Sequence, residues 1–361
     1  MEILTEFEKK PLYFQDQTDI ISCNKLADIP RCFEEMENVL NKGYYLAGFL
    51  SYEAGYGFEE KLKTGKTFDF PLVHMGVYGP PLSLPLRKGE TFSLRMEGID
   101  ISTEKYSENI EKIRSYIAAG DVYQITYCVK FNFDFDGDAF SFYKKLKKEQ
   151  PVPYPAYIKD KDFSILSLSP EMFIKKNGTH VKTKPMKGTW PRGSNFWQDI
   201  LAGRALHKDP KNRAENIMIC DLLRNDLGRI GSLVRAPKLF EVAKYLTLCQ
   251  MTSTVTANVD KDIPLHKLFS SLHPSGSVTG APKIRAMEII REIEPDERRI
   301  YTGAIGYITP QKDLFFNVPI RTLLIKGGKG EMGVGGGIVW DSTPQGEYDE
   351  CILKAKFLRD A

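Results

Sequence analysis

No stretch of this sequence approaches the roughly 18 consecutive apolar residues that a membrane-spanning helix needs. Residues 1–10 mix acidic and basic side chains and lack the apolar core that marks a signal peptide. Dense basic runs with interleaved aromatic residues are also absent, and a formal net charge of +3 is too small to indicate nucleic-acid binding. We therefore expect neither a membrane nor a nucleic acid as a partner.

Metal-binding and disulfide spacings are missing as well. No two cysteines are spaced as a Cys-x-x-Cys pair, and the five histidines do not complete a zinc-binding pattern. This usage favours reduced thiols and a cytoplasmic location. The six cysteines are Cys23, Cys32, Cys128, Cys220, Cys249 and Cys351.

What is present is ordinary globular composition. Of the 361 residues, 42% are hydrophobic and 27% are charged, which is enough to bury a large core. Length alone suggests about two domains. The polar stretch 87–90, which follows Pro80 and Pro81, is a candidate seam. We predict an N-terminal part over residues 1–95 and a core over residues 96–361.

The local patterns predict both helices and strands. Apolar residues recur at helical spacing over residues 103–118, where Ser102 or Thr103 can cap the helix and Gly120 can end it. Strand runs with helices outside them favour an α+β layered fold and not a regular βαβ repeat. A further helix is predicted over residues 139–149, and strands over residues 122–133, 162–169, 300–309, 314–325 and 331–340.

Lys187 is the most informative single residue. It follows the predicted strand that ends at Pro170 and Glu171, and it stands between Pro185 and the turn-forming Gly188. A lysine amine in a confined site, near a carboxylic acid, is equipped for nucleophilic displacement on a small electrophile. An ion-paired loop lysine is the alternative interpretation.

Two predicted helices carry further carboxylates. Glu215 falls on the same helix face as Met218 and Leu222, so it is either a first-turn residue favoured by the helix dipole or one of two buried acids that need a cation. The last helix places Glu347, Glu350, Cys351 and Lys354 on one face. That face is either a salt-bridged surface edge or a site for Mg²⁺ and a substrate carboxylate.

Three other features are compatible with anion binding. The glycine-rich run 333–339 fails the G-x-G-x-x-G pattern, so it is either a backbone site for a carboxylate or a bulged core strand. Lys283, in the first turn of a helix that starts near Pro282, is either solvated or close to an anion. Arg321, on a predicted apolar strand, is expected to pair with a carboxylate of the protein or of a ligand.

Together these runs resemble the chorismate-utilising enzymes, a family that includes component I of anthranilate synthase and of aminodeoxychorismate synthase, and the isochorismate and salicylate synthases. The resemblance covers about residues 100–357, and it implies one large α/β sandwich of two β-sheets with outer helices, so the seam near residue 90 need not separate independent domains. The matching runs are 167–171, 187–189, 215–229, 273–283, 301–304, 321–322 and 333–354, with a weaker likeness at 51–54.

The resemblance also implies roles for individual residues. Glu215 and Glu350 would hold Mg²⁺ with support from Glu347, and Glu171 would act as the general acid at the C4 hydroxyl of chorismate. The remaining substrate-binding residues implied by the motifs are Thr189, Thr279, Gly280, Lys283, Tyr301, Arg321, Gly335, Gly337 and Lys354.

Three positions indicate the branch of the family. Gln124 stands where the isochorismate and salicylate branches carry a water-activating lysine, which favours amination. Lys187 stands where anthranilate synthases usually have alanine, and in the aminodeoxychorismate branch this lysine forms a covalent adduct before ammonia displaces it. Gln250 replaces a common histidine and cannot shuttle a proton, in agreement with a product that keeps its enolpyruvyl group.

The resemblance predicts formation of 4-amino-4-deoxychorismate for 4-aminobenzoate and folate biosynthesis. It implies a separate glutamine amidotransferase subunit that supplies ammonia and a separate lyase that acts on the product. An anthranilate synthase component I, or a catalytically degenerate chorismate-binding regulatory subunit, are the alternatives.

Overall fold

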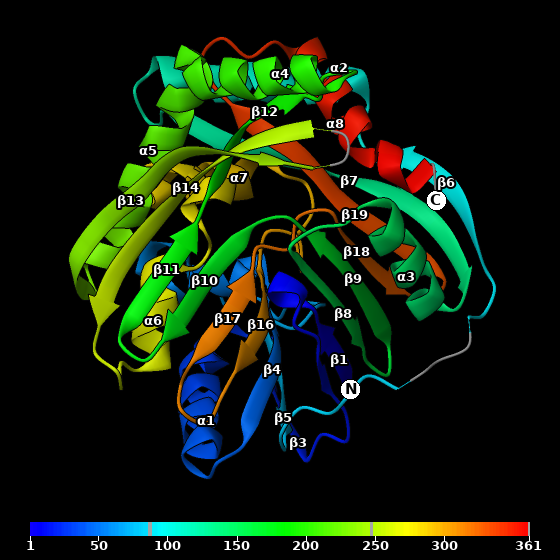
Figure 1. Ribbon diagram of the computed structural model, residues 1–361, viewed down its shortest axis with the longest axis vertical. Coiled ribbons are helices and arrows are strands. Elements are labelled where there is room, and N and C mark those ends of the chain that lie inside the picture. Colours follow the sequence, from blue (N-terminus) through cyan, green and yellow to red (C-terminus); the bar gives the residue numbers. More distant parts are fainter. Residues whose placement is uncertain (86–88, 246–247, 360–361) are drawn as a thin grey trace.

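Two antiparallel β-sheets, packed face to face with helices outside them, make up the described part of the protein (Figure 1). The computed structural model describes residues 1–85, 89–245 and 248–359, so Arg87 and Lys88 of the candidate seam lie outside the described residues. The arrangement confirms the α+β sandwich predicted from the sequence.

The first sheet has nine strands within the described residues, and the second has ten. In spatial order the first sheet contains β15 (Gly280–Ala281), β7 (Gln124–Gly137), β19 (Lys329–Ile338), β18 (Thr322–Lys326), β9 (Phe163–Ser169), β8 (Tyr154–Lys159), β1 (Glu2–Thr5) and β2 (Leu12–Phe14), with β6 (Phe92–Ile99) paired to β7. The second contains β12 (Met186–Pro191), β14 (Leu248–Val259), β11 (His180–Lys184), β10 (Met172–Asn177), β17 (Leu314–Asn317), β16 (Ala304–Ile308), β4 (Tyr45–Leu50), β5 (Val73–Tyr78) and β3 (Asp19–Cys23), with β13 (Gly231–Lys244) paired to β14.

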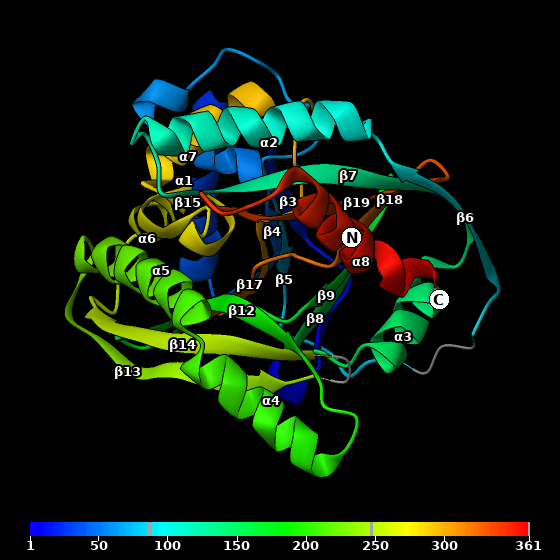
Figure 2. The same cartoon turned by 90° about the horizontal axis from the view of Figure 1, so that it is seen from above.

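The helices cover the outer faces and one end of the sandwich (Figure 2). They are α1 (Ile29–Asn41), α2 (Thr103–Ala118), α3 (Ala139–Glu149), α4 (Phe196–Lys208), α5 (Pro210–Gly228), α6 (Leu265–Leu272), α7 (Lys283–Ile293) and α8 (Pro344–Arg359), together with the short 3-10 helices Phe7–Lys9, Leu26–Asp28, Tyr52–Phe58, Glu60–Leu62 and Gly276–Val278. Helix α5 contacts β12, β13 and β14, whereas α8 contacts β19 and α2.

Helices α2 and α3 have the predicted bounds because their signals are local. The Ser102 hydroxyl accepts a hydrogen bond from the backbone N–H of Lys105 at 3.2 Å and so caps α2. The Asp138 carboxylate accepts one from the N–H of Ser141 at 2.8 Å and caps α3 in the same way. Tyr106 and Ile110 on the predicted apolar face of α2 are buried.

The predicted strand over residues 314–325 is wrong. It is divided into β17 and β18, which belong to different sheets. Pro319 in the connection has no N–H to donate to a ladder, and Arg321 has a φ of +50°, so the chain turns there instead of continuing. Arg321 therefore lies in a crossover between the sheets and not on a strand.

A second crossover lies beside the first. Pro170 and Glu171 connect β9 of the first sheet to β10 of the second. The N–H of Val318 donates to the carbonyl of Glu171 at 3.1 Å, and the Ser169 hydroxyl donates to the carbonyl of Val318 at 2.5 Å. These hydrogen bonds join the two crossovers. The crossovers place the side chains of Glu171 and Arg321 between the sheets.

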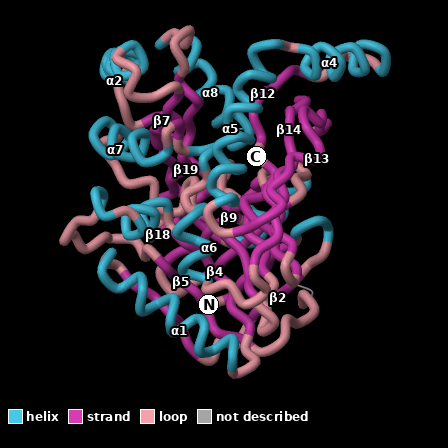
Figure 3. Tube along the Cα trace, turned by 90° about the vertical axis from the view of Figure 1, so that its left-hand side faces the viewer, coloured by secondary structure: helices cyan, strands magenta, loops and turns pink. Residues whose placement is uncertain are grey.

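The N-terminal strands lie together at one end of the sandwich (Figure 3). Many of the side chains buried in the core there are aromatic. The rings of Phe7 and Phe315, from different parts of the chain, lie 4.9 Å apart, and those of Phe49 and Phe70 lie 5.2 Å apart. Burying each such ring stabilises the fold by roughly 1.5–3 kcal/mol. The N-terminal strands contribute to both sheets, with β1 and β2 in the first and β3 to β5 in the second.

All six cysteines are buried and have free thiols, as their spacing predicted. Within the described ranges, no helix combines the length and the apolar character that crossing a membrane requires. The division into an N-terminal part and a core at residue 95 stays a prediction.

Candidate active site

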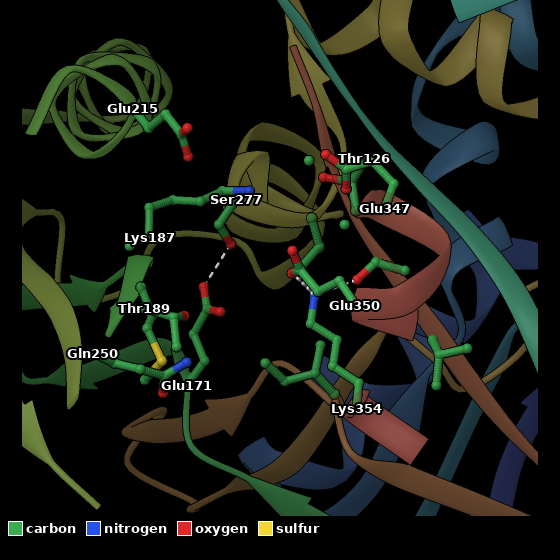
Figure 4. A pocket seen from close by; sticks show the side chains of 18 of the residues that line it. Thr126, Glu171, Lys187, Thr189, Glu215, Gln250, Ser277, Glu347, Glu350 and Lys354 are labelled. Carbon is green, nitrogen blue, oxygen red and sulfur yellow. Dashed lines mark hydrogen bonds and ion pairs between the residues drawn. The ribbon is translucent and has the colours of Figure 1, made fainter. Parts of the chain in front are cut away.

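A cavity of about 380 Å³ lies between the two sheets, beside the two crossovers (Figure 4). Strands β7, β12 and β19 and helices α5 and α8 contribute to its wall. The structure brings most of the candidate site residues together here, although their chemical roles stay predictions. Those that line the cavity are Glu171, Lys187, Thr189, Glu215, Tyr301, Arg321, Gly335, Gly337, Glu347, Glu350 and Lys354.

The Lys187 side chain reaches into the cavity from β12 and lies between Glu171 and Glu215 (Figure 4). The β12–β14 register shifts between Met186 and Thr189, so Lys187 and Gly188 form a bulge, and Gly188 has a φ of +94°. Burial lowers the pKa of Lys187, while the charges of Glu215 and Glu171 act in the opposite direction. A larger fraction of this amine is therefore neutral than in an exposed lysine.

Glu171 is almost fully buried at the second crossover, with 3% of its surface exposed. The Ser277 hydroxyl donates a hydrogen bond to Glu171 Oε1 at 2.5 Å, and Ser277 itself lies 2.9 Å from the hydroxyl of Ser275. Burial raises the pKa of Glu171 to about 7, against the opposing effects of Ser277 and Lys187. Near neutral pH this carboxyl can therefore hold a proton and release it.

Glu215 lies in the second turn of α5, and the first-turn interpretation is wrong. The helix begins at Pro210, and the carboxylate of Asp209 caps it by accepting from the N–H of Asn212 at 2.8 Å. Glu215 is half-buried, and burial raises its pKa, while Lys187 opposes the shift. Its carboxylate points toward the cavity (Figure 4).

Helix α8 supplies acids and one base from the opposite side. Glu347 accepts a hydrogen bond from the Ser342 hydroxyl at 2.6 Å, and burial raises the pKa of this glutamate. Glu350 forms an ion pair with Lys354 at 2.6 Å, and the Lys354 amine also donates to the carbonyl of Gly335 at 2.6 Å. This face points toward the cavity and is not a plain surface edge.

Arg321 forms no ion pair with a carboxylate among the described residues; its guanidinium donates to the Gln150 side-chain oxygen at 3.5 Å. The guanidinium is half-buried, and burial lowers its pKa. Because a desolvated charge without a partner is costly, the cavity favours a carboxylate of a ligand over one of the protein.

The glycine-rich strand β19 pairs with β7 without a bulge, so the bulged-strand interpretation is wrong. A side chain at Gly335 would collide with the Tyr127 carbonyl, 2.1 Å from the position of its Cβ. A Cβ at Gly337 would lie 1.9 Å from the Gln124 amide nitrogen and 3.1 Å from the Lys187 amine. Glycine at position 337 thus lets the Gln124 amide and the Lys187 amine approach the backbone of β19.

Three candidate residues do not line the cavity. The Lys283 amine pairs with Asp226 at 2.7 Å and donates to the Ser271 carbonyl at 3.1 Å, so its partner is a protein carboxylate and not a bound anion. Thr279 is fully buried, and its hydroxyl donates to the backbone carbonyls of Ser275 and Gly276. Gly280 pairs with β7 in strand β15.

Sequence reasoning missed Ser277 and Thr126, although both stood beside residues that it used. Ser277 lies in the quoted run 273–283, and Thr126 lies two residues beyond Gln124 on the same face of β7. The Thr126 hydroxyl, the Gln124 amide and the Gln250 side-chain oxygen are buried without a hydrogen-bond partner within the described structure. Thr126 and Gln250 line the cavity, so their unpaired groups are available to a polar ligand.

The carboxylates fit a magnesium ion that shares its coordination with a substrate. No group of three or more acidic, histidine or cysteine side chains lies close enough to hold a metal ion by itself within residues 1–85, 89–245 and 248–359. Glu215 and the α8 glutamates nevertheless offer hard oxygen donors from two sides of one cavity. Magnesium typically takes one or two carboxylates plus substrate oxygens and water, as this set allows.

Comparison with known proteins agrees with this geometry. The model of a family described as chorismate binding enzyme matches residues 82–360. Aminodeoxychorismate synthase component 1 of Klebsiella aerogenes is 40% identical over 257 residues, 71% of this chain and 57% of the relative. The Bacillus subtilis protein of the same name is 39% identical over 253 residues, 69% of this chain and 54% of the relative. The chain thus matches little more than half the length of these relatives.

Among solved structures, anthranilate synthase component I from Streptococcus pneumoniae superposes with a TM-score of 0.78 at 25% identity. The match covers 99% of this chain and 89% of that structure. The fold is therefore shared over the whole sandwich.

Proposed function

The chain belongs to the chorismate-binding enzyme family, and from this premise we propose that it converts chorismate and ammonia to 4-amino-4-deoxychorismate. One observation carries the proposal: the Lys187 amine, with a lowered pKa, projects into the cavity between a buried acid, Glu171, and Glu215. The names of the Klebsiella and Bacillus relatives support the same branch.

In the proposed reaction, Arg321, Tyr301 and Lys354 bind the enolpyruvyl carboxylate of chorismate. Glu171 donates its proton to the C4 hydroxyl, which leaves as water while the neutral Lys187 amine forms a bond at C2 and the two ring double bonds each shift one position toward C4. Ammonia then forms a bond at C4, the ring double bonds shift back, the C2–nitrogen bond breaks, and the lysine is released with its electron pair. The new ammonium group returns a proton to the Glu171 carboxylate. The enolpyruvyl group stays on the product.

We propose Mg²⁺ as the cofactor, held by Glu215 and Glu350 with Glu347 in support. Bound there, the ion would offset the negative charge of the ring carboxylate and orient the substrate. Two acids with pKa values raised by burial, Glu215 and Glu347, support a cation at this position.

Replacing Glu215 by glutamine is expected to weaken Mg²⁺ binding by about tenfold or more, because one charged ligand becomes a neutral amide. Calorimetric titration of Mg²⁺ in the presence of chorismate checks this. The matched control is Asp221→Asn on the exposed face of the same helix, where the carboxylate pairs with Arg224 at 2.9 Å. Equal Mg²⁺ affinity in the two variants would remove Glu215 from the metal site.

The component naming of the relatives implies a partner component. We propose that this partner is a glutamine amidotransferase that supplies ammonia, that a separate lyase converts the product to 4-aminobenzoate for folate biosynthesis, and that the enzyme acts in the cytoplasm.

Product analysis of the purified protein with chorismate, Mg²⁺ and ammonium tests the proposed function. We expect an aminated product that retains its enolpyruvyl group, identified by mass spectrometry. Anthranilate with stoichiometric pyruvate would instead assign the chain to the anthranilate branch. Unchanged chorismate, with the amidotransferase component also present, would indicate a degenerate chorismate-binding subunit.

A further inference from the structure

The bulge that carries Lys187 leaves backbone groups outside the regular ladder. Pairing of β12 with β14 is regular at Met186–Thr252 and again at Thr189–Gln250, but Lys187 and Gly188 oppose a single residue, Met251. A bulge of this kind bends its strand and re-aims a side chain, and it persists only if the displaced carbonyls find donors.

Asn216 on α5 supplies those donors. Its side-chain amide nitrogen lies 3.4 Å from the carbonyl oxygen of Lys187 and 3.5 Å from that of Met251. One –NH₂ group, with two hydrogens, thus reaches both strands at the bulge. Asn216 is 1% exposed and does not line the cavity, so it meets neither solvent nor substrate.

The amide is itself held in one orientation. Its oxygen accepts a hydrogen bond from the Ser253 hydroxyl at 2.5 Å and a weaker one from the Cys220 thiol at 3.6 Å. Ser253 in turn accepts from the N–H of Phe240 at 3.0 Å. The –NH₂ group is therefore directed at the two carbonyls and cannot be exchanged with the oxygen without losing these contacts.

A neighbouring contact fixes the same bulge. A Cβ at Gly188 would lie 2.8 Å from the Asn212 side-chain oxygen, so the glycine is packed directly on α5 one turn before Asn216. Asn212 is fixed by Asp209, which accepts from its amide at 2.8 Å. Helix α5 thus contacts both residues of the bulge: Asn216 contacts Lys187, and Asn212 contacts Gly188.

We infer that Asn216 is a positioning residue for the reaction: it ties the Lys187 bulge of β12 to β14 and to α5, and so sets the direction of the Lys187 side chain relative to Glu215. Glu215 is the preceding residue of the helix, so the same segment orders the amine and the carboxylate. This inference rests on the proposed function only in treating Lys187 as the nucleophile.

The test compares two buried asparagines. Asn216→Ala removes the donors at the bulge, whereas Asn109→Ala removes a buried amide that donates to the Tyr127 hydroxyl at 2.7 Å, outside the cavity lining. We expect both to lower Tm. Asn216→Ala should also lower kcat about tenfold or more with a chorismate KM within about threefold of wild type, and Asn109→Ala should keep kcat within about twofold.

A second readout does not depend on turnover. With the bulge released, Lys187 is less confined, so trinitrobenzenesulfonate should label it about threefold faster in Asn216→Ala than in wild type, measured by peptide mass spectrometry against the labelling of Lys144. Unchanged labelling, or a kcat loss no larger than in Asn109→Ala, overturns the inference. If wild type makes no aminated product, the proposed function fails while the labelling result still decides the positioning role.

Ser253→Ala covers the case in which Asn216→Ala does not fold. It removes the hydroxyl that orients the amide and leaves Asn216 in place, so we expect a smaller loss, about threefold in kcat, with Lys187 labelling raised in the same direction. Wild-type kcat and labelling in this variant would overturn the inference.

Discussion

Alanine at position 187 is expected to lower the kcat of ammonia-dependent chorismate amination by at least about 100-fold, because the proposed route passes through a bond to the Lys187 nitrogen. The amine projects into the cavity, and burial lowers its pKa, so the neutral, nucleophilic form is more abundant than in an exposed lysine. Steady-state formation of the aminated product, followed by mass spectrometry, measures the loss. Trapping of a mass increment on the peptide that contains Lys187, in the absence of ammonium, would detect the adduct directly.

Lys187→Arg separates nucleophilic catalysis from ion pairing. Arginine keeps the positive charge beside Glu171 and Glu215 but does not deprotonate in proteins. The variant therefore keeps the charge and loses the nucleophile. We expect this variant to be as inactive as the alanine variant. Lys182→Ala is the matched control, since burial also lowers the pKa of Lys182 but its side chain does not line the cavity. Substantial activity in Lys187→Arg would make Lys187 an electrostatic residue and end the covalent proposal.

Local signals explain which parts of the fold the sequence predicts. The bounds of α2 and α3 follow from apolar spacing and from the caps at Ser102 and Asp138, all of which lie within a few residues of one another. Pairing within a sheet depends on distant partners. The apolar run from Leu314 to Ile325 has the pattern of one strand, but the chain changes sheet at Pro319. The neighbouring Val318 there bonds to Glu171, which is far away in the sequence and therefore invisible to a local pattern.

The same distinction applies to the site. Motif resemblance placed Lys187, Glu171, Glu215 and Glu350 at one cavity, because a motif carries three-dimensional information that spacing alone does not. The helix-dipole argument predicted an anion near Lys283, and that anion is Asp226 on another helix. The substrate-binding role came only from the resemblance, and Lys283 does not line the cavity. Asn216 has no visible signal in the sequence, since a polar residue inside a helix is ordinarily a solvated one.

Glutamine at position 171 is expected to lower kcat by about 10²- to 10⁴-fold, the usual contribution of a general acid. The C4 hydroxyl leaves poorly unless it is protonated, and glutamine cannot donate a transferable proton. Its amide oxygen can still accept the hydrogen bond from Ser277, so the fold around the crossover should be retained. Near-wild-type kcat in Glu171→Gln would exclude Glu171 as the acid.

The pH dependence of kcat/KM, which reports groups of the free enzyme, gives an independent check. Burial raises the pKa of Glu171 to about 7, so the protonated acid disappears and the rate should fall as the pH rises through about 7. Lys187 must be neutral to react, so kcat/KM should rise with pH as its amine loses a proton. Burial has lowered the pKa at which this rise occurs. Because Glu171 and Lys187 interact, the two apparent pKa values of the profile belong to the pair and not to either residue alone. The difference between these pKa values reports how strongly the carboxylate and ammonium charges stabilise each other.

Variants around Glu171 should move this profile in known directions. The Ser277 hydroxyl favours the charged carboxylate, so its removal in Ser277→Ala raises the pKa of Glu171 and shifts the descending limb to higher pH. Glu171→Gln should abolish that limb and leave the residual rate rising to a plateau. Glu53→Gln is the control: burial raises the pKa of Glu53 to about 8, but this carboxyl accepts from backbone N–H groups outside the cavity lining. A descending limb that was lost in Glu53→Gln and persisted in Glu171→Gln would show that the titrating group is outside the cavity lining and that Glu171 is not the general acid.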